Sequence, residues 1–123
     1  MADVLVERGD DAIATVVLSN PGRMNALSRP MWERVAAVFA ELDADASLRC
    51  IVIRGAGEQA FAAGADIAEF ATERANVEQA RAYGRVIQNA MDAVAHCRHP
   101  VVAMIHGVCV GGGLELAAIC DMR

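Results

Sequence analysis

Three consecutive glycines followed by a carboxylate form the segment of this sequence that is best suited to chemistry. The apolar residues Val108–Val110 read as a strand, Gly111–Gly113 as a turn, and Leu114 onward as a helix with Glu115 in its first turn. Glycine lets a ligand approach the backbone, and the unpaired N–H groups of a helix start favour a developing negative charge. A polarised carbonyl oxygen fits that place, and Glu115 could transfer a proton to or from the same bound group.

A second glycine-containing segment, Gln59–Ile67, follows an apolar strand predicted over residues 49–54. Taken alone, either segment has a simpler interpretation, in which glycine allows tight strand-to-helix packing and Glu115 compensates the helix dipole. Two such strand exits in one chain make a pair of backbone donors possible.

Together the two segments resemble the crotonase family, also called the enoyl-CoA hydratase/isomerase superfamily. Its members carry an A-G-A-D loop, here Ala63–Asp66, and a G-G-G-x-E-L helix start at these relative positions. The resemblance extends to Asn20–Ser28 near the beginning and to Cys120–Arg123 at the end, so it covers nearly the whole chain. It implies an α/β fold, the N-terminal half of the crotonase-like ββα spiral.

The resemblance implies an acyl-CoA thioester as substrate and an oxyanion hole for its carbonyl oxygen, formed by the N–H groups of Ala65 and Gly112. It makes Glu115 the first of two acid–base residues with which the hydratases add water to a 2-enoyl-CoA. Coenzyme A is part of this substrate, so we expect no separate cofactor and no metal. A lysine often follows the A-G-A-D-I run in the family, where this chain has alanine. The residues expected along the CoA site are Arg23, Met24, Ala26, Ala63, Ala65, Asp66, Ile67, Ala68, Val110, Gly111 and Gly112.

The second acid of the hydratases lies, by resemblance, beyond Arg123. We therefore expect residues 1–123 to be a crotonase-like domain truncated before that acid, and this chain alone to be inactive. Apolar residues make up 55% of it, above the roughly 45–50% that a typical domain reaches with glycine included, which indicates surface that faces further chain or other subunits. Complete family members form homotrimers or dimers of trimers. Two alternatives stay open: a crotonase-fold isomerase, which shares the hole but places its acid differently, and an inactive acyl-CoA-binding or assembly fragment.

Charge and composition argue against several other classes of protein. A net charge of −5 and few aromatic residues disfavour nucleic acid and anionic membranes as partners. The start, Met1–Val4, lacks a signal peptide's basic and apolar regions, and the apolar run Val101–Ile105 is too short to span a membrane, so a cytoplasmic location is predicted. The four cysteines show no C-x-x-C spacing and read as reduced core residues.

Two rival motifs fail in context. Gly55–Ala60 matches the dinucleotide-binding pattern G-x-G-x-x-A, but Phe61–Gly64 prevents the long helix that this pattern requires. His96–His99 could suggest zinc, yet no second ligand pair is present, and we interpret it as a helix end before Pro100.

Hydrophobic periodicity and capping signals predict alternating strands and helices, and hence parallel pairing. The connection between Ala65 and Glu78 is predicted to be mobile or partly helical. We expect the Ala65 and Gly112 amides to converge at the carboxyl ends of adjacent parallel strands, with Glu115 facing them. Besides Val108–Val110, the predicted strands are Val4–Arg8, Ile13–Leu18, Cys50–Ile53 and Val101–Ile105, and the predicted helices are Ser28 to about Asp43, Glu78–Cys97 and Leu114–Cys120.

Overall fold

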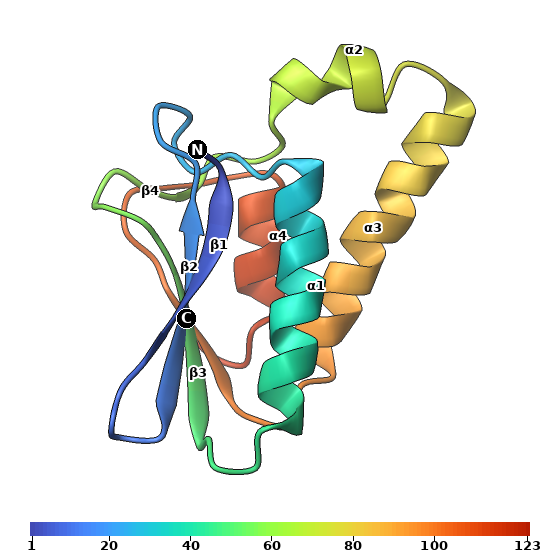
Figure 1. Ribbon diagram of the computed structural model, residues 1–123. Helices are drawn as coiled ribbons and strands as arrows, with labels where there is room; N and C mark the ends of the chain where they lie inside the picture. Colours follow the sequence, from blue (N-terminus) through green and yellow to red (C-terminus); the bar gives the residue numbers. More distant parts are fainter.

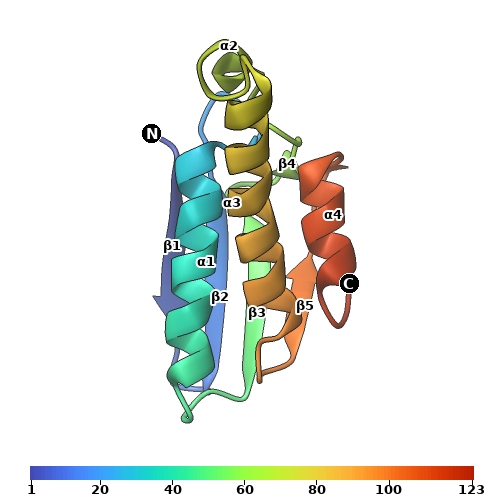
Figure 2. The same ribbon diagram turned by 90° about the vertical axis from the view of Figure 1, so that its right-hand side faces the viewer.

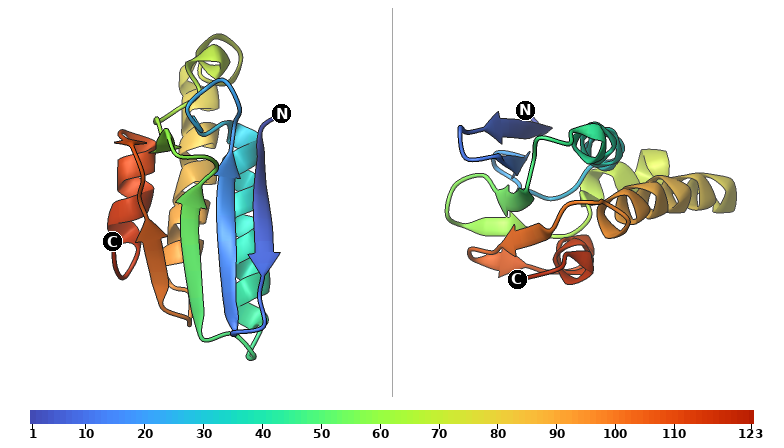
Figure 3. Two further views of the ribbon diagram at one scale, coloured as in Figure 1. Left: turned by 90° about the vertical axis from the view of Figure 1, so that its left-hand side faces the viewer. Right: turned by 90° about the horizontal axis from the view of Figure 1, so that it is seen from below.

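The computed structural model describes residues 1–123 and consists of one main sheet with helices on a single face (Figure 1). The main sheet has the strand order β1-β2-β3-β5, in which β1 and β2 pair antiparallel and the other neighbours pair parallel. Figure 3 shows the helical layer on one side of this sheet and no helix on the other. The strands are β1 (Asp3–Arg8), β2 (Ile13–Ser19), β3 (Cys50–Gly55) and β5 (Val101–Met104).

Two long helices connect the parallel strands, and a shorter helix ends the chain. Figure 2 shows them side by side in front of the sheet, with α3 between α1 and α4. A second, two-stranded parallel sheet lies at the carboxyl edge of the main sheet. The remaining elements are α1 (Arg29–Ala44), β4 (Ala60–Ala62), the 3-10 turn η1 (Ile67–Glu69), α2 (Phe70–Glu73), α3 (Val77–Ala95), β6 (Val108–Cys109) and α4 (Gly112–Ile119).

Capping and periodicity explain why α1 forms where it does. The Ser28 hydroxyl caps the helix by accepting a hydrogen bond from the Met31 amide, and Pro30 lies in the first turn, where its missing N–H costs nothing. The buried side chains recur at the three- and four-residue spacing of an amphipathic helix. They are Met31, Trp32, Val35, Val38, Phe39 and Leu42.

The hydrophobic core lies between the sheet and the helices and contains 25 buried residues. In β3, Ile51 and Ile53 are buried in this core, whereas Cys50, Val52 and Arg54 alternate with them and are half-buried on the other face. Phe39 and Tyr83 are among the largest fully buried side chains, one on each long helix. The core therefore joins both long helices to the main sheet.

The structure confirms the predicted α/β class and every predicted helix and strand to within a few residues. The connection after Ala65 is partly helical, as predicted, because it contains η1 and α2. One strand was missed: β4, which is three residues long and too short to show a periodic pattern, whereas β6 lies within the strand predicted over Val108–Val110.

The structure also shows what the two rival motifs, Gly55–Ala60 and His96–His99, form. Gly55–Ala60 joins the end of β3 to the start of β4, so the dinucleotide-binding interpretation was correctly rejected. His96 is the C-cap of α3, which confirms the predicted helix end.

All four cysteines are free thiols. Cys120 belongs to the core, and Cys97 and Cys109 are half-buried and pack against it. Only the half-buried Cys50 departs from the prediction.

None of the helices combines the length and the apolar character needed to cross a membrane. Several large apolar side chains are nevertheless exposed, and many of them belong to the C-terminal part of the chain, from the end of β5 onward. These are Met104, Ile105, Val108, Val110, Leu114 and Met122.

Candidate active site

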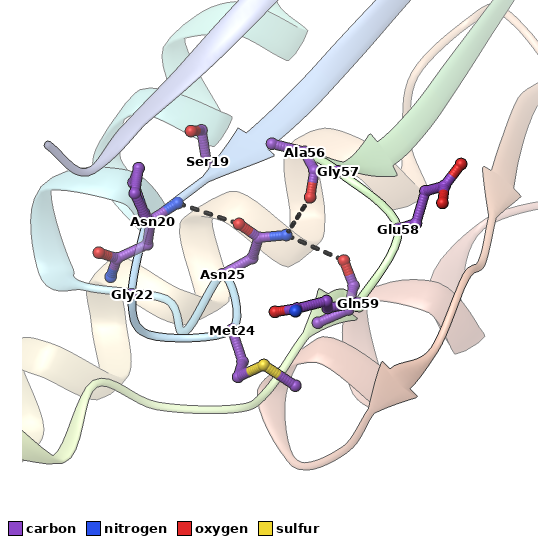
Figure 4. A pocket seen from close by; sticks show the side chains of 11 residues that line it. Ser19, Asn20, Gly22, Met24, Asn25, Ala56, Gly57, Glu58 and Gln59 are labelled. Atoms are coloured by element: carbon purple, nitrogen blue, oxygen red, sulfur yellow. Dashed lines mark hydrogen bonds between the residues drawn. The ribbon is translucent and has the colours of Figure 1, made fainter.

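The candidate site lies at the carboxyl edge of the main sheet, the upper edge in Figure 1, where the loops that follow β2, β3, β4 and β6 meet. Asn25 holds the loop after β2 against the loop after β3. Its side-chain amide donates to the carbonyl oxygens of Ala56 and Ala60 at 3.0 and 2.9 Å, and its carbonyl accepts the Asn20 amide at 3.1 Å (Figure 4). The cavity of about 250 Å³ between these loops is therefore bordered by an amide that is already bonded within the chain.

The parallel pair β4–β6 brings the two glycine-containing segments side by side. Ala62 pairs with Cys109, and each segment leaves its strand directly after this pair. We expected the first segment to follow the strand at residues 49–54; instead it leaves β4, the short strand that comes next in the chain. The second segment leaves β6, which lies within the strand predicted over Val108–Val110, and β4 and β6 are adjacent and parallel.

Glycine is required where the two segments touch. Gly111 has a φ of 55°, in the left-handed region, and a Cβ there would lie 3.4 Å from the Gly64 Cα. A Cβ on Gly113 would lie 2.3 Å from the Ala62 carbonyl oxygen, so only glycine lets α4 pack this closely on β4.

The amides of Ala65 and Gly112 donate no hydrogen bond within the chain, although the amides beside them do. The Asp66 amide donates to the Leu27 carbonyl at 3.1 Å, and the Gly113 amide donates to the Val110 carbonyl at 3.0 Å. Backbone N–H groups are rarely left without a partner away from solvent, and both Ala65 and Gly112 are half-buried. The fold therefore leaves two donors for another molecule.

Both residues line one cavity of about 220 Å³ together with Glu115. Glu115 lies in the first turn of α4, is exposed, and forms no ion pair. The predicted grouping of two amides and one carboxylate is thus present in space, and their catalytic roles stay predictions. The other residues of this cavity, here called the amide cavity, are Trp32, Arg74, Ile87 and Gly111.

A second cavity of about 450 Å³ shares Ala65 with the first. Seven of the residues predicted for the CoA site line this second cavity, here called the Arg23 cavity. Within it, the Arg23 guanidinium lies 3.3 Å from the Asp66 carboxylate, and the Arg23 side chain is 52% exposed. The seven residues are Arg23, Met24, Ala26, Ala63, Ala65, Asp66 and Ile67.

Two predicted CoA-site residues lie outside both cavities. Ala68 is exposed in the 3-10 turn, where its amide is bonded to the Asp66 carboxylate at 3.1 Å. Val110 is exposed before the Gly111 turn, and its carbonyl is used by the amides of Gly113 and Leu114.

Glu69 anchors the connection formed by η1 and α2, which follows Ala65 and leads to Arg74. Its carboxylate accepts the Arg29 amide at 2.8 Å and the Tyr83 hydroxyl at 2.7 Å, so it joins the starts of α1 and α3. Burial raises the pKa of the Tyr83 hydroxyl, and the hydrogen bond to Glu69 raises it further. The hydroxyl therefore keeps its proton and remains a donor.

Sequence reasoning missed three residues of the amide cavity, Trp32, Arg74 and Ile87. Trp32 has the sequence pattern of a core residue and is 1% exposed. Its ring also packs against Gly112, since a Cβ on Gly112 would lie 3.0 Å from the ring. Arg74 lies in the alanine-rich connection, and only its position over the Tyr83 ring, 4.2 Å from the ring centre, places it at the site.

Comparison with known proteins identifies the family. The sequence profile of the enoyl-CoA hydratase/isomerase family matches residues 8–123. The chain belongs to this family. Among its relatives in the enoyl-CoA hydratase/isomerase family is the short-chain-enoyl-CoA hydratase of Clostridium acetobutylicum, 31% identical over 121 residues that make up 98% of this chain and 45% of the relative. The human mitochondrial Delta(3,5)-Delta(2,4)-dienoyl-CoA isomerase is 33% identical over 117 residues, or 88% of this chain and 35% of the isomerase.

Solved structures of the family share the fold closely. A Magnetospirillum magneticum protein described as an enoyl-CoA hydratase/carnithine racemase superposes with a TM-score of 0.94 at 54% identity, over 98% of this chain and 45% of that one. The enoyl-CoA hydratase of Bacillus anthracis superposes with a TM-score of 0.90 at 33% identity, over 98% of this chain and 46% of the other. The chain thus spans less than half the length of these relatives and corresponds to part of their domain.

Proposed function

We propose that the protein containing this chain adds water to a 2-enoyl-CoA thioester. The observation that carries the proposal is the meeting of two unpaired backbone amides, from Ala65 and Gly112, with the Glu115 carboxylate in one cavity. Backbone donors aimed at a developing oxyanion are among the strongest contributions to acyl-thioester chemistry, and they need no side chain. Membership of the enoyl-CoA hydratase/isomerase family supplies the substrate class.

In the proposed reaction, the thioester carbonyl oxygen accepts hydrogen bonds from the Ala65 and Gly112 amides. As the water oxygen bonds to C3, negative charge moves onto this carbonyl oxygen, and the two amides and the positive end of α4 stabilise it. Glu115 exchanges protons with the water, so that hydroxyl is added at C3 and a proton at C2 on the same face of the double bond. The family resemblance assigns the second acid to sequence beyond Arg123.

The shared residue Ala65 indicates how the substrate would lie. With the thioester at Ala65, the coenzyme A part would occupy the Arg23 cavity and the acyl part the amide cavity. The half-exposed Arg23 guanidinium is a suitable partner for a phosphate of coenzyme A. A phosphate carries more negative charge than the Asp66 carboxylate that Arg23 now contacts, and it forms charge-assisted hydrogen bonds with arginine. This would compensate for the alanine at position 68.

Isomerisation is the runner-up, because the family relatives include a dienoyl-CoA isomerase at an identity similar to that of the hydratase. Both reactions use the oxyanion hole. They differ in the product, which is 3-hydroxyacyl-CoA for hydration and a shifted double bond for isomerisation. One relative is named as the alpha subunit of a fatty acid oxidation complex, which supports a role for this protein in fatty acid metabolism.

The exposed apolar residues at the C-terminal part of the chain support a homo-oligomer, a trimer or a dimer of trimers, as the state of the complete protein. Further chain of the same molecule would cover part of this surface. A cytoplasmic location also stays a prediction, since the relatives include enzymes named as mitochondrial and peroxisomal.

The test is crotonyl-CoA hydration by the natural full-length protein and its Glu115→Gln variant. Glutamine keeps the size of the side chain and removes proton transfer, so we expect the rate to fall by roughly 10²–10⁴-fold with acyl-CoA affinity retained. Glu78→Gln is the matched control, because Glu78 is also an exposed acid in the first turn of a helix but lies outside the site. A Glu115→Gln rate within a few-fold of the parent would reduce Glu115 to a dipole-compensating acid, and a parent that only shifts double bonds would favour the isomerase.

A further inference from the structure

Arg74 is the one cationic side chain that lines the amide cavity, and it has no counter-ion. It is half-buried, and no carboxylate oxygen of the chain lies within 4.0 Å of its guanidinium. Glu115 lines the same cavity but is not close enough to form an ion pair with it. Arginine keeps its charge at every physiological pH and has five N–H donors, so residues 1–123 contribute to this cavity a cation that none of their own carboxylates pairs with.

The guanidinium is held in place by aromatic rings instead of by charge. It lies 4.2 Å from the centre of the Tyr83 ring and 5.1 Å from that of the Phe70 ring. Tyr83 is fully buried and is fixed in turn by its hydrogen bond to Glu69. Stacking uses the face of the guanidinium plane and leaves the N–H groups along its edge available to a planar acceptor.

We propose that Arg74 selects acyl-CoA substrates whose acyl chain ends in a carboxylate. The inference rests on the proposed function in one respect, that the thioester lies at Ala65, between the two cavities. With coenzyme A in the Arg23 cavity, the free end of the acyl chain enters the amide cavity and reaches the residues that line it. A terminal carboxylate there pairs with Arg74 through charge-assisted hydrogen bonds, for which arginine geometry is best suited.

The same feature discriminates against neutral acyl chains. An alkyl end of equal length takes water away from the guanidinium and gives it no acceptor in return, which leaves its donors unpaired. Sites built around a polar partner reject analogues that lack it more strongly than apolar pockets reject analogues that differ in size. Arg74 therefore changes the ratio of the kcat/KM values for the two kinds of substrate and takes no part in the chemical step.

The experiment compares glutaconyl-CoA, which ends in a carboxylate, with 2-pentenoyl-CoA, a neutral substrate of the same chain length, in the natural full-length protein. We expect kcat/KM to favour glutaconyl-CoA by at least about tenfold, the effect of one charge-assisted hydrogen bond. Arg74→Met should abolish or reverse this preference, and Arg74→Lys should keep part of it. Arg81→Met is the matched control: it removes an exposed cation of α3 that also has no ion pair and lies outside the site, and it should leave the ratio unchanged.

Binding of the unreactive thioesters glutaryl-CoA and pentanoyl-CoA separates this proposal from the proposed function. If neither enoyl substrate is hydrated but Arg74→Met removes a tenfold binding preference for glutaryl-CoA, the hydratase proposal is wrong and the Arg74 proposal stands. If 2-pentenoyl-CoA is hydrated as well as glutaconyl-CoA, and Arg74→Met leaves both ratios unchanged while thermal unfolding shows a folded variant, Arg74 does not select the substrate.

Discussion

The two edges of the parallel sheet are formed by the same strands but treat their polar groups differently. At the amino edge, two polar side chains have partners within the chain: His99 Nε2 contacts the carbonyl oxygens of Leu42 and Asp45 at 3.0 and 2.9 Å, and the Asp45 carboxylate lies 2.6 Å from the Arg8 guanidinium. At the carboxyl edge, the amides of Ala65 and Gly112 have none.

This difference separates stability from function. The contacts of His99 and Asp45 at the amino edge close loops that connect helices to strands. Unpaired donors at the carboxyl edge lie where ligands of parallel α/β sheets bind, outside the carboxyl ends of the strands. Changes at the amino edge should therefore affect folding alone, whereas changes at the carboxyl edge should affect activity as well.

The largest stability effect is expected from two helical glycines that carry opposite predictions. Gly113→Ala forces a Cβ to within 2.3 Å of the Ala62 carbonyl oxygen, so it should destabilise the fold by about 3 kcal/mol and lower hydration by displacing α4. A Cβ on Gly84, in α3, meets nothing within 4 Å, so Gly84→Ala should stabilise the fold by roughly 0.5–1 kcal/mol without changing activity. Urea unfolding and crotonyl-CoA hydration measure both, and an unaffected Gly113→Ala would show that α4 does not need this close contact.

His99→Ala should have a smaller effect, confined to stability. Both contacts of His99 Nε2 are carbonyl oxygens, so this nitrogen carries a proton and donates. Removing the ring leaves the carbonyl oxygens of Leu42 and Asp45 without this donor, which should lower the free energy of unfolding by about 2 kcal/mol. His96→Ala, at the exposed end of α3, serves as control and should cost less than about 0.5 kcal/mol. A fall in kcat for His99→Ala in the folded protein would contradict the separation of the two edges.

The smallest effect is expected for Asp45 and depends on pH. The hydrogen bond from the Ser47 hydroxyl, followed by that from Arg8, lowers the pKa of Asp45 from its ordinary 3.8 to about 2. A carboxyl whose pKa is lower in the folded state stabilises the fold above its unfolded pKa, and this contribution is lost as the pH falls from about 4 to 2. Asp45→Asn should flatten the dependence of unfolding on pH in this window, and an unchanged slope would show that the pairing does not persist in solution.

The sequence was sufficient for most of the fold because long amphipathic elements leave periodic patterns. Ser28 and Pro30 marked the start of α1, and the apolar spacing after residue 77 marked α3. The short strand β4 left no such pattern, because it is stabilised by pairing with β6 and by α4. Whether two or three residues form a strand depends on the tertiary contacts around them, and these contacts leave no pattern in the local sequence.

The site was predictable to the extent that it consists of motifs. Ala65, Gly112 and Glu115 were found because glycine-containing strand exits and a first-turn acid have a physical signature and match a family pattern. Arg74 was not found, because an arginine in an alanine-rich connection has no signature until the fold places it over Tyr83. Ala68 was assigned to the CoA site by its place in a motif, and in the structure it lies in the 3-10 turn and does not line the Arg23 cavity.

The most direct test of the central claim concerns the N–H group of Gly112. This residue is the first of α4, a position that accepts proline because its N–H has no partner in the helix. Gly112→Pro removes the donor, and Gly112→Ala keeps it while adding the same Cβ beside Trp32. In the full-length protein, with both variants shown to be folded by thermal unfolding, we expect kcat for crotonyl-CoA hydration to be lower in Gly112→Pro than in Gly112→Ala by roughly 10²–10³-fold. Values of kcat within a few-fold of each other would show that the Gly112 amide does not stabilise the transition state.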